Sequence, residues 1–237
     1  MIGLVIIVKE KNLISDKFDI TFKDLTREKY LYYVNNREME HQIGRLFNMN
    51  KIFEQIKKDN IPGDIIEFGV YQGFSLSWLA RFRDLHKLNN RKIIGIDSFE
   101  GLPITSGPWV KHTFGDSTEV IVNKTLKQQL TNIQQRNIII IKAWFDDLAL
   151  EKKLQTETNS LALIHIDCDL KVSLQSIFNL IELYLKGIQF LLFDDWGICD
   201  EEIPLGFNEW ESSHSFIKSE IIYKTFLTRY YKIYSYT

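Results

Sequence analysis

Carboxylates gather at the ends of two strongly apolar runs of the 237-residue chain. The stretch "LLFDDWG" closes on Asp194 and Asp195, and the stretch "LALIHIDCD" closes on Asp167 and Asp169. Ionised carboxylates held side by side repel one another, so this pattern favours a positive group between the two ends. Hard divalent cations such as Mg²⁺ prefer all-oxygen ligands of this kind. At either end alone, capping of the next segment or pairing with a lysine explains the carboxylates equally well.

A glycine turn forms the second candidate site. In "IIEFGVYQGFS", Gly69 and Gly73 follow an apolar run and precede a helical pattern, where a sharp turn and a close ligand approach require glycine. The spacing is GxxxG and not the GxGxxG of dinucleotide-binding proteins. The next apolar run ends on Asp97, which is placed to accept hydrogen bonds from ribose hydroxyls. The alternative is that Asp97 and Ser98 belong to an ordinary turn.

These residues require elements that bring them together. Five short runs rich in Ile, Leu, Val and Phe are interspersed with helical patterns, which predicts a doubly wound α/β fold with a mostly parallel sheet. Two β-rich runs, "SEIIYKTF" and "RYYKIYSYT", predict an antiparallel C-terminal pair. Open sheets of this kind bind ligands beyond the carboxyl ends of their strands. Five acidic residues lie at such ends: Glu67, Asp97, Asp167, Asp194 and Asp195.

Composition narrows the functional class. The net charge of −2 shows no basic excess for nucleic acid, and the apolar N-terminal stretch is too short to span a membrane. Cys168 and Cys199 form no metal-binding pattern, and a buried inert thiol is the better interpretation of Cys168. We expect a cytoplasmic protein with an N-terminal helical cap segment over residues 1–60 and a catalytic domain over residues 61–237.

The motifs together resemble the macrocin O-methyltransferases, the TylF, MycF and NovP type of class I S-adenosylmethionine (SAM)-dependent methyltransferases. The resemblance extends over about residues 48–215 and includes "IPGDIIEFGVYQG", "IGIDSFEGLP", "KAWFDD", "HIDCDLKVS" and "LLFDDWG". Members of that family methylate sugar hydroxyls of natural products and use magnesium. The resemblance therefore implies SAM and Mg²⁺ as cofactors and a small molecule with a sugar-type hydroxyl as the acceptor.

The resemblance also implies roles for individual residues. Asp167, Asp194 and Asp195 would be the metal ligands, and Asp167 would also be the catalytic base. The implied cofactor-binding residues are Glu67, Gly69, Val70, Tyr71, Gly73, Asp97, Ser98, Ala143, Trp144 and Asp167.

Four further residues have open roles. His165 either supports the site or is a core histidine, and His214 is a weaker candidate for substrate contact than for a surface position. Lys171 stands where the family usually has tyrosine, so it either favours an acidic acceptor or is solvent-exposed. Trp144 either stacks on adenine or packs in the core with Phe145.

Two other functional classes remain open at this point. One is a Mg²⁺-dependent enzyme that processes nucleotides or phosphates, but "GVYQGFS" lacks the lysine of a phosphate loop. The other is an inactive methyltransferase-like binding module. The acceptor's identity and the oligomeric state are open, and a homo-oligomer is one candidate.

Overall fold

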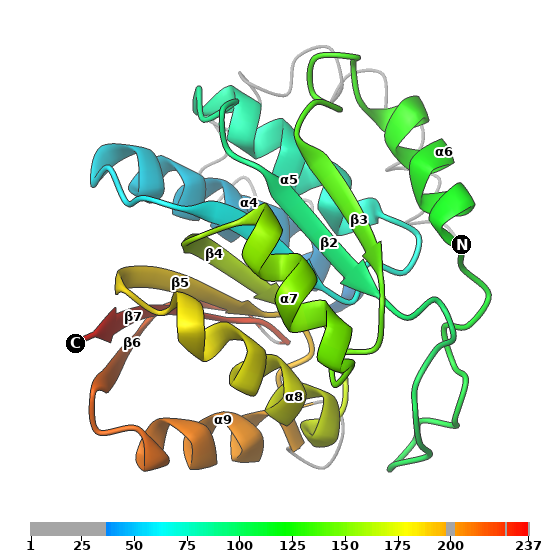
Figure 1. Ribbon diagram of the computed structural model, residues 1–237, viewed down its shortest axis with the longest axis vertical. Helices are drawn as coiled ribbons and strands as arrows, with labels where there is room; N and C mark the ends of the chain where they lie inside the picture. Colours follow the sequence, from blue (N-terminus) through cyan, green and yellow to red (C-terminus); the bar gives the residue numbers. More distant parts are fainter. Residues whose placement is uncertain (1–36, 198–201, 226, 237) are drawn as a thin grey trace.

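The computed structural model describes residues 37–197, 202–225 and 227–236 of the chain. They include a seven-stranded sheet in the order β3-β2-β1-β4-β5-β7-β6, with helices on both faces (Figure 1). Strands β1 to β5 are parallel, β7 runs antiparallel to β5, and β6 runs antiparallel to β7. The predicted doubly wound sheet with an antiparallel C-terminal pair is therefore confirmed.

All seven strands arise from the apolar and β-rich runs of the sequence. Their bounds are β1 Asp64–Phe68, β2 Ile93–Asp97, β3 Ile138–Lys142, β4 Leu161–Ile166, β5 Gly187–Phe193, β6 Ile217–Lys224 and β7 Arg229–Ser235.

The helices include two that the apolar periodicity did not reveal, α7 and α9. The helix bounds are α4 Arg37–Lys58, α5 Phe74–Leu85, α6 Glu119–Gln129, α7 Leu148–Glu157, α8 Lys171–Ile181 and α9 Glu202–Ser213, with a 3₁₀ turn η1 at Glu182–Tyr184. None of the helices in these described ranges is long and apolar enough to cross a membrane.

Helix α4 occupies the described part of the predicted N-terminal cap segment. Its side chains Met49, Phe53 and Ile56 are fully buried in the same apolar core as β1 and α5. Residues 1–36 of the predicted segment, and Cys199, lie outside the described residues.

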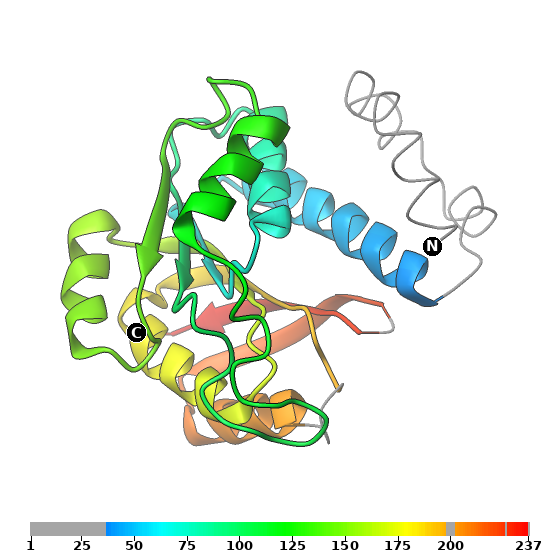
Figure 2. The same cartoon turned by 90° about the vertical axis from the view of Figure 1, so that its right-hand side faces the viewer.

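The two faces of the sheet are covered by different helices, because alternate residues of a strand point to opposite sides. Ile66 and Ile94 pack on one side with α7, α8 and α9. Ile65 and Ile93 pack on the other side with α4, α5 and α6. Figures 1 and 2 show these two helical layers on either side of the sheet.

The polar residues of the central strands keep to this alternation. Glu67 lies two positions after Ile65, and Asp194 lies two positions after Leu192, on the side that α4 covers. His165 pairs with Glu67 across the β1–β4 ladder and faces the same side. The strands therefore direct these polar groups toward α4.

The first turn packs closely against the end of β4 at Gly69. Its φ is +87°, and a Cβ built there would lie only 1.8 Å from the carbonyl oxygen of Asp167. We expect Gly69→Ala to lower the free energy of unfolding by about 3 kcal/mol or more, since it combines left-handed strain with overpacking.

Gly187→Ala is the matched control, because Gly187 has φ +76° but no atom within 4 Å of the added Cβ. It should cost only about 1 kcal/mol of backbone strain. Chemical denaturation measures both values, and equal losses in the two variants would contradict the close approach.

Candidate active site

The first turn is held in shape by Asp97. Its Oδ2 accepts hydrogen bonds from the backbone N–H groups of Val70 (2.9 Å) and Tyr71 (2.8 Å), and its Oδ1 accepts one from Phe99 (2.7 Å). These bonds support the left-handed backbone of Tyr71, whose φ is +48°. A carboxylate offers about four acceptor positions, so Asp97 retains capacity for a ligand hydroxyl. Asp97 thus takes part in the turn, which was the alternative that the sequence left open, and its ribose contact stays a prediction.

The other predicted cofactor residues lie along the same edge of the sheet. Ser98 Oγ accepts a hydrogen bond from Glu100 N (3.1 Å), and Ala143 N donates to the Asp97 carbonyl (3.0 Å). Trp144 is half-buried, while Phe145 packs edge-on against Phe68 with ring centres 5.5 Å apart. Phe145 therefore serves the core, and the stacking role predicted for Trp144 stays a prediction.

Gly69 and Gly73 are each required by contact with a different neighbouring element. A Cβ at Gly73 would lie 3.1 Å from Val122 Cγ1 in α6, so this position favours glycine because of helix packing as well as its φ of +82°. Gly69 is required by the approach of Asp167. The turn is therefore compact against both β4 and α6.

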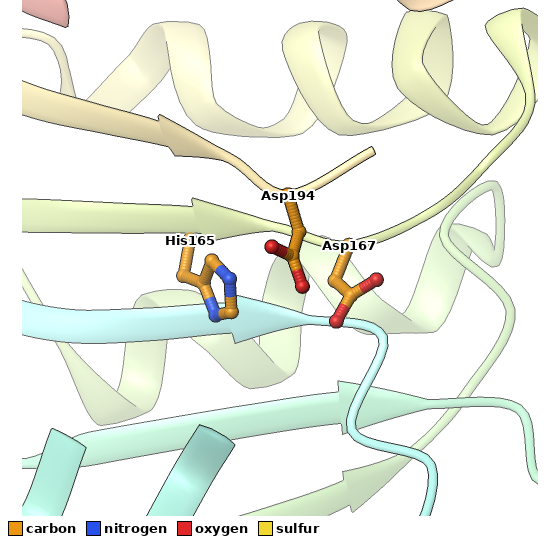
Figure 3. Close-up of side chains that lie close together, drawn as sticks. All are labelled: His165, Asp167 and Asp194. Carbon is orange, nitrogen blue, oxygen red and sulfur yellow. The ribbon is translucent and has the colours of Figure 1, made fainter. Parts of the chain in front are cut away.

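Carboxylates from β4 and β5 converge beside this turn. Asp167 N donates to the Phe68 carbonyl (2.9 Å) and Asp194 N donates to the Ile166 carbonyl (3.0 Å), which aligns the ends of β1, β4 and β5. One ligand atom each from His165, Asp167 and Asp194 lies within 4.8 Å of the other two (Figure 3). Two of the three predicted metal ligands are therefore brought together, with His165 beside them.

Asp195 lies next to this group. Its charge contributes to the raised pKa of both Asp167 and Asp169. Asp169 is buried and has a left-handed φ of +58°, which turns the chain from β4 into α8. The four carboxyl groups form one cluster at the strand ends.

Burial and mutual repulsion keep protons on this cluster. Burial, followed by the charges of Asp194 and Asp195, raises the pKa of Asp167 well above its usual range. Burial and the charge of Asp195 raise the pKa of Asp169 to about 8, and burial with Asp194 raises that of Asp195 to about 6. Positive charge is needed if all of these groups are to ionise at neutral pH.

Helix α4 supplies some of that charge. Arg45 is buried and its Nη1 donates to Asp194 Oδ2, while His41 Nε2 lies 3.4 Å from Asp194 Oδ1. Burial would lower the pKa of Arg45, but the charges of Asp194 and Asp167 outweigh it and raise the pKa above its ordinary value. The sequence reasoning missed both residues, although their i, i+4 spacing in "HQIGR" places them on one helix face.

Glu67 and His165 form a second buried pair next to the cluster. His165 Nδ1 lies 2.7 Å from Glu67 Oε1, and both side chains are fully buried. His165 is thus buried in the core and also lies beside the carboxylates, so both roles that the sequence left open stay predictions. Glu67 contacts His165, and its predicted cofactor role stays a prediction.

Several buried polar atoms at this edge lack a hydrogen-bond partner in the described part of the chain. They include His165 Nε2 and Glu67 Oε2, while Asp194 Oδ1 has its contact with His41 Nε2 at 3.4 Å. Such atoms are costly to bury, and together with the nearby carboxylates they match the donor set of a divalent cation. The residues present thus fit a cation at this position.

Three other residues that the sequence analysis named either form ion pairs or are buried. Lys171 Nζ pairs with Glu209 Oε1 (2.6 Å) of α9 in a partly exposed ion pair, and its influence on the acceptor stays a prediction. His214 Nε2 pairs with Glu182 (2.8 Å) near the start of β6. This position lies at the ends of the strands opposite to the carboxylates. Cys168 is buried, as expected.

The long loop after β2 is tied to this edge by Glu202. Its Oε1 accepts a hydrogen bond from Ser106 Oγ, and its Oε2 accepts one from Lys171 N (2.8 Å) at the start of α8. A carboxylate at a helix N-terminus is favourable. The loop, α8 and α9 are thereby joined beside the carboxylate cluster.

A family profile decides the relationship of the chain to known proteins. The Macrocin-O-methyltransferase (TylF) profile matches residues 39–221, which is well over half of the chain. The chain belongs to the macrocin O-methyltransferase family. The resemblance inferred from the motifs is therefore confirmed, and the matched range includes α4 with Arg45.

Two relatives from Streptomyces share about a quarter of the aligned residues. A tetracenomycin enzyme of Streptomyces olivaceus, 8-demethyl-8-(2,3-dimethoxy-alpha-L-rhamnosyl)-tetracenomycin-C 4'-O-methyltransferase, is 25% identical over 65% of this chain. The alignment spans 60% of that relative, which is less than two-thirds of its length. Demethyldecarbamoylnovobiocin O-methyltransferase of Streptomyces niveus is 23% identical over 76% of this chain and 71% of its own.

Solved structures share the fold. The O-methyltransferase NovP superposes with a TM-score of 0.68 at 19% identity, covering 80% of this chain and 79% of its own. The calicheamicin methyltransferase CalS11 superposes with a TM-score of 0.66 at 19% identity, covering 93% of this chain and 91% of its own. At this identity the likeness establishes the Rossmann-like methyltransferase fold.

The pairing of Arg45 with Asp194 generates a prediction about cation binding. Arg45→Met keeps the buried stem but leaves Asp194 without its guanidinium partner. The cation-free variant should lose about 3 kcal/mol of unfolding free energy, since an uncompensated buried charge remains. Added MgCl₂ should stabilise this variant more than the wild type, because the guanidinium no longer competes for Asp194 Oδ2.

Arg81→Met is the matched control. Arg81 is a partly buried arginine that stacks on Trp78 and contacts Gln129, away from the carboxylates. Its response to MgCl₂ in thermal unfolding should equal that of the wild type. Identical MgCl₂ responses of the Arg45 and Arg81 variants would show that Arg45 does not compete with a cation.

Proposed function

We propose that this chain transfers the methyl group of SAM to a hydroxyl of a sugar or a glycosylated small molecule, with a divalent cation, Mg²⁺, at the strand ends. Family membership supports the reaction class, and the names of both Streptomyces relatives support O-methylation. The name of the first relative includes a rhamnosyl group, which supports a sugar-type acceptor. The observation that carries the proposal is the meeting of the carboxylate cluster with the glycine turn.

The donor half of the site would be formed by the first turn and the ends of β2 and β3. Gly69 and Gly73 keep the turn compact, and Asp97 retains acceptor capacity for ribose hydroxyls. Val70, Tyr71, Ser98, Ala143 and Trp144 lie along the same edge. When bound, SAM supplies an electrophilic methyl group on a sulfonium.

The acceptor half would be formed by the carboxylates. Asp167, Asp194 and Asp195 would hold the cation, whose positive charge favours ionisation of an alcohol. We assign the uptake of the hydroxyl proton to Asp167, and its partial burial and the contact of its carbonyl with the glycine turn support this role.

The first turn also weighs against a phosphate-processing enzyme. Phosphate loops bind their ligand through free backbone N–H groups. In this turn the N–H groups of Val70 and Tyr71 already donate to Asp97. An inactive binding module would not require a cluster of carboxylates beside the cofactor turn. Cytoplasmic location and assembly as a homo-oligomer stay predictions.

The Asp167→Asn variant tests the acceptor half of the site independently of the donor half. The variant should bind SAM and S-adenosylhomocysteine about as well as the wild type in calorimetry. Its turnover should fall by about 10²–10⁴-fold, because it lacks the proton acceptor. Turnover is measured as S-adenosylhomocysteine formation with methyl α-L-rhamnopyranoside as the acceptor and MgCl₂ present.

Asp59→Asn is the control, since Asp59 precedes β1 at the opposite edge of the sheet and should leave turnover unchanged. EDTA should abolish wild-type turnover, and excess MgCl₂ should restore it. Folded wild-type protein that binds neither SAM nor S-adenosylhomocysteine would end the proposal. Turnover unaffected by EDTA would remove the cation from it.

A further inference from the structure

His165 has one ring nitrogen committed and one directed at the carboxylates. Its Nδ1 lies 2.7 Å from Glu67 Oε1, and the two residues face each other across the β1–β4 ladder. Its Nε2 is buried and has no hydrogen-bond partner among the described residues. Figure 3 shows the imidazole beside the carboxylates of Asp194 and Asp167.

The pairing with Glu67 determines which nitrogen carries the proton. An ionised carboxylate only accepts hydrogen bonds, so a neutral imidazole donates its Nδ1–H to Glu67. Nε2 then keeps its lone pair and becomes an acceptor. A fully buried acceptor without a donor requires another partner, and His165 Nε2 has none among the described residues, although it lies beside Asp167 and Asp194.

A cation satisfies all of these groups at once. The ligand atoms of His165, Asp167 and Asp194 lie within 4.8 Å of one another. Around an ion about 2.1 Å from its ligands, neighbouring ligand atoms are roughly 3–4 Å apart. A small contraction of the side chains would therefore bring all three into coordination.

We propose that His165 is a direct ligand, through Nε2, of the divalent cation held by Asp167 and Asp194, and that Glu67 fixes its tautomer. This assignment rests on the proposed function, which places a cation at these strand ends. A histidine that binds a metal through one nitrogen commonly donates its other N–H to a carboxylate, as His165 does to Glu67. The assignment converts an all-oxygen site into a mixed nitrogen–oxygen site.

The ligand set has a consequence for metal preference. Imidazole suits Fe²⁺, Ni²⁺ and Zn²⁺, whereas Mg²⁺ and Mn²⁺ favour carboxylate and water oxygens. Removing His165 should therefore weaken Ni²⁺ binding much more than Mg²⁺ binding. An oxygen-only site would lose little affinity for either ion.

Pulsed electron paramagnetic resonance of the full chain with MnCl₂ tests the assignment directly. Electron spin echo envelope modulation detects a ¹⁴N nucleus bound to Mn²⁺. The wild type should show this ¹⁴N modulation, and uniform labelling of histidine with ¹⁵N should replace it by a ¹⁵N pattern. This comparison needs no mutation, so it holds even if a variant of the buried pair fails to fold.

Variants identify which histidine is responsible. His165→Gln should remove the nitrogen modulation and raise the Kd for Ni²⁺ by about 10-fold or more. His41→Gln is the matched variant at the other histidine near Asp194, and it should keep the modulation. His214→Gln, at the opposite ends of the strands, should keep both the modulation and the affinity.

The outcomes separate this assignment from the proposed function. Bound Mn²⁺ without any ¹⁴N modulation, or modulation lost in the His41 variant but kept in the His165 variant, would overturn the role of His165 and leave the cation site intact. Absence of any Mn²⁺ binding would overturn the cation site together with this assignment.

Discussion

Asp194 is a carboxylate buried against a buried arginine, and the arrangement of the site depends on this contact. The residue is 2% exposed and lies beside Asp167 and Asp195, and a buried carboxylate is costly unless a charged partner faces it. Helix α4 provides Arg45, and Tyr230 in turn donates a hydrogen bond from its hydroxyl to the Arg45 carbonyl (2.9 Å). The described part of α4 is thus integral to the site, since it both fills the core and partly neutralises the strand ends.

The donor and acceptor halves of the proposed site lie side by side at the carboxyl ends of the strands. The carbonyl of Asp167 leaves no space for a side chain at Gly69, and Asp97 fixes the turn that contains this glycine. The proposed base and the cofactor turn are therefore in direct contact. Placement of this kind favours catalysis, because reacting groups held in a fixed geometry avoid the entropy cost of finding one another.

Apolar runs and strand-end carboxylates are local features, which is why the sequence predicted the sheet and most of the acidic cluster. Helix α9 escaped prediction because Pro204 and Gly206 interrupt its pattern, and α7 because it buries only Leu150 and Leu154. The partnership of Arg45 with Asp194 joins residues 149 positions apart, and the Glu67–His165 pair depends on the strand register. Contacts of this kind follow from topology and have no local signature.

Anomalous diffraction from crystals grown with MnCl₂ and S-adenosylhomocysteine tests the central claim most directly. The account predicts a manganese peak within coordination distance of Asp167 and Asp194, beside a nucleoside bound at the Gly69–Gly73 turn. It also predicts that Arg45 no longer donates to Asp194 Oδ2. A bound nucleoside with no manganese peak at the strand ends, and Arg45 still paired with Asp194, would show that the carboxylates are neutralised by the protein alone.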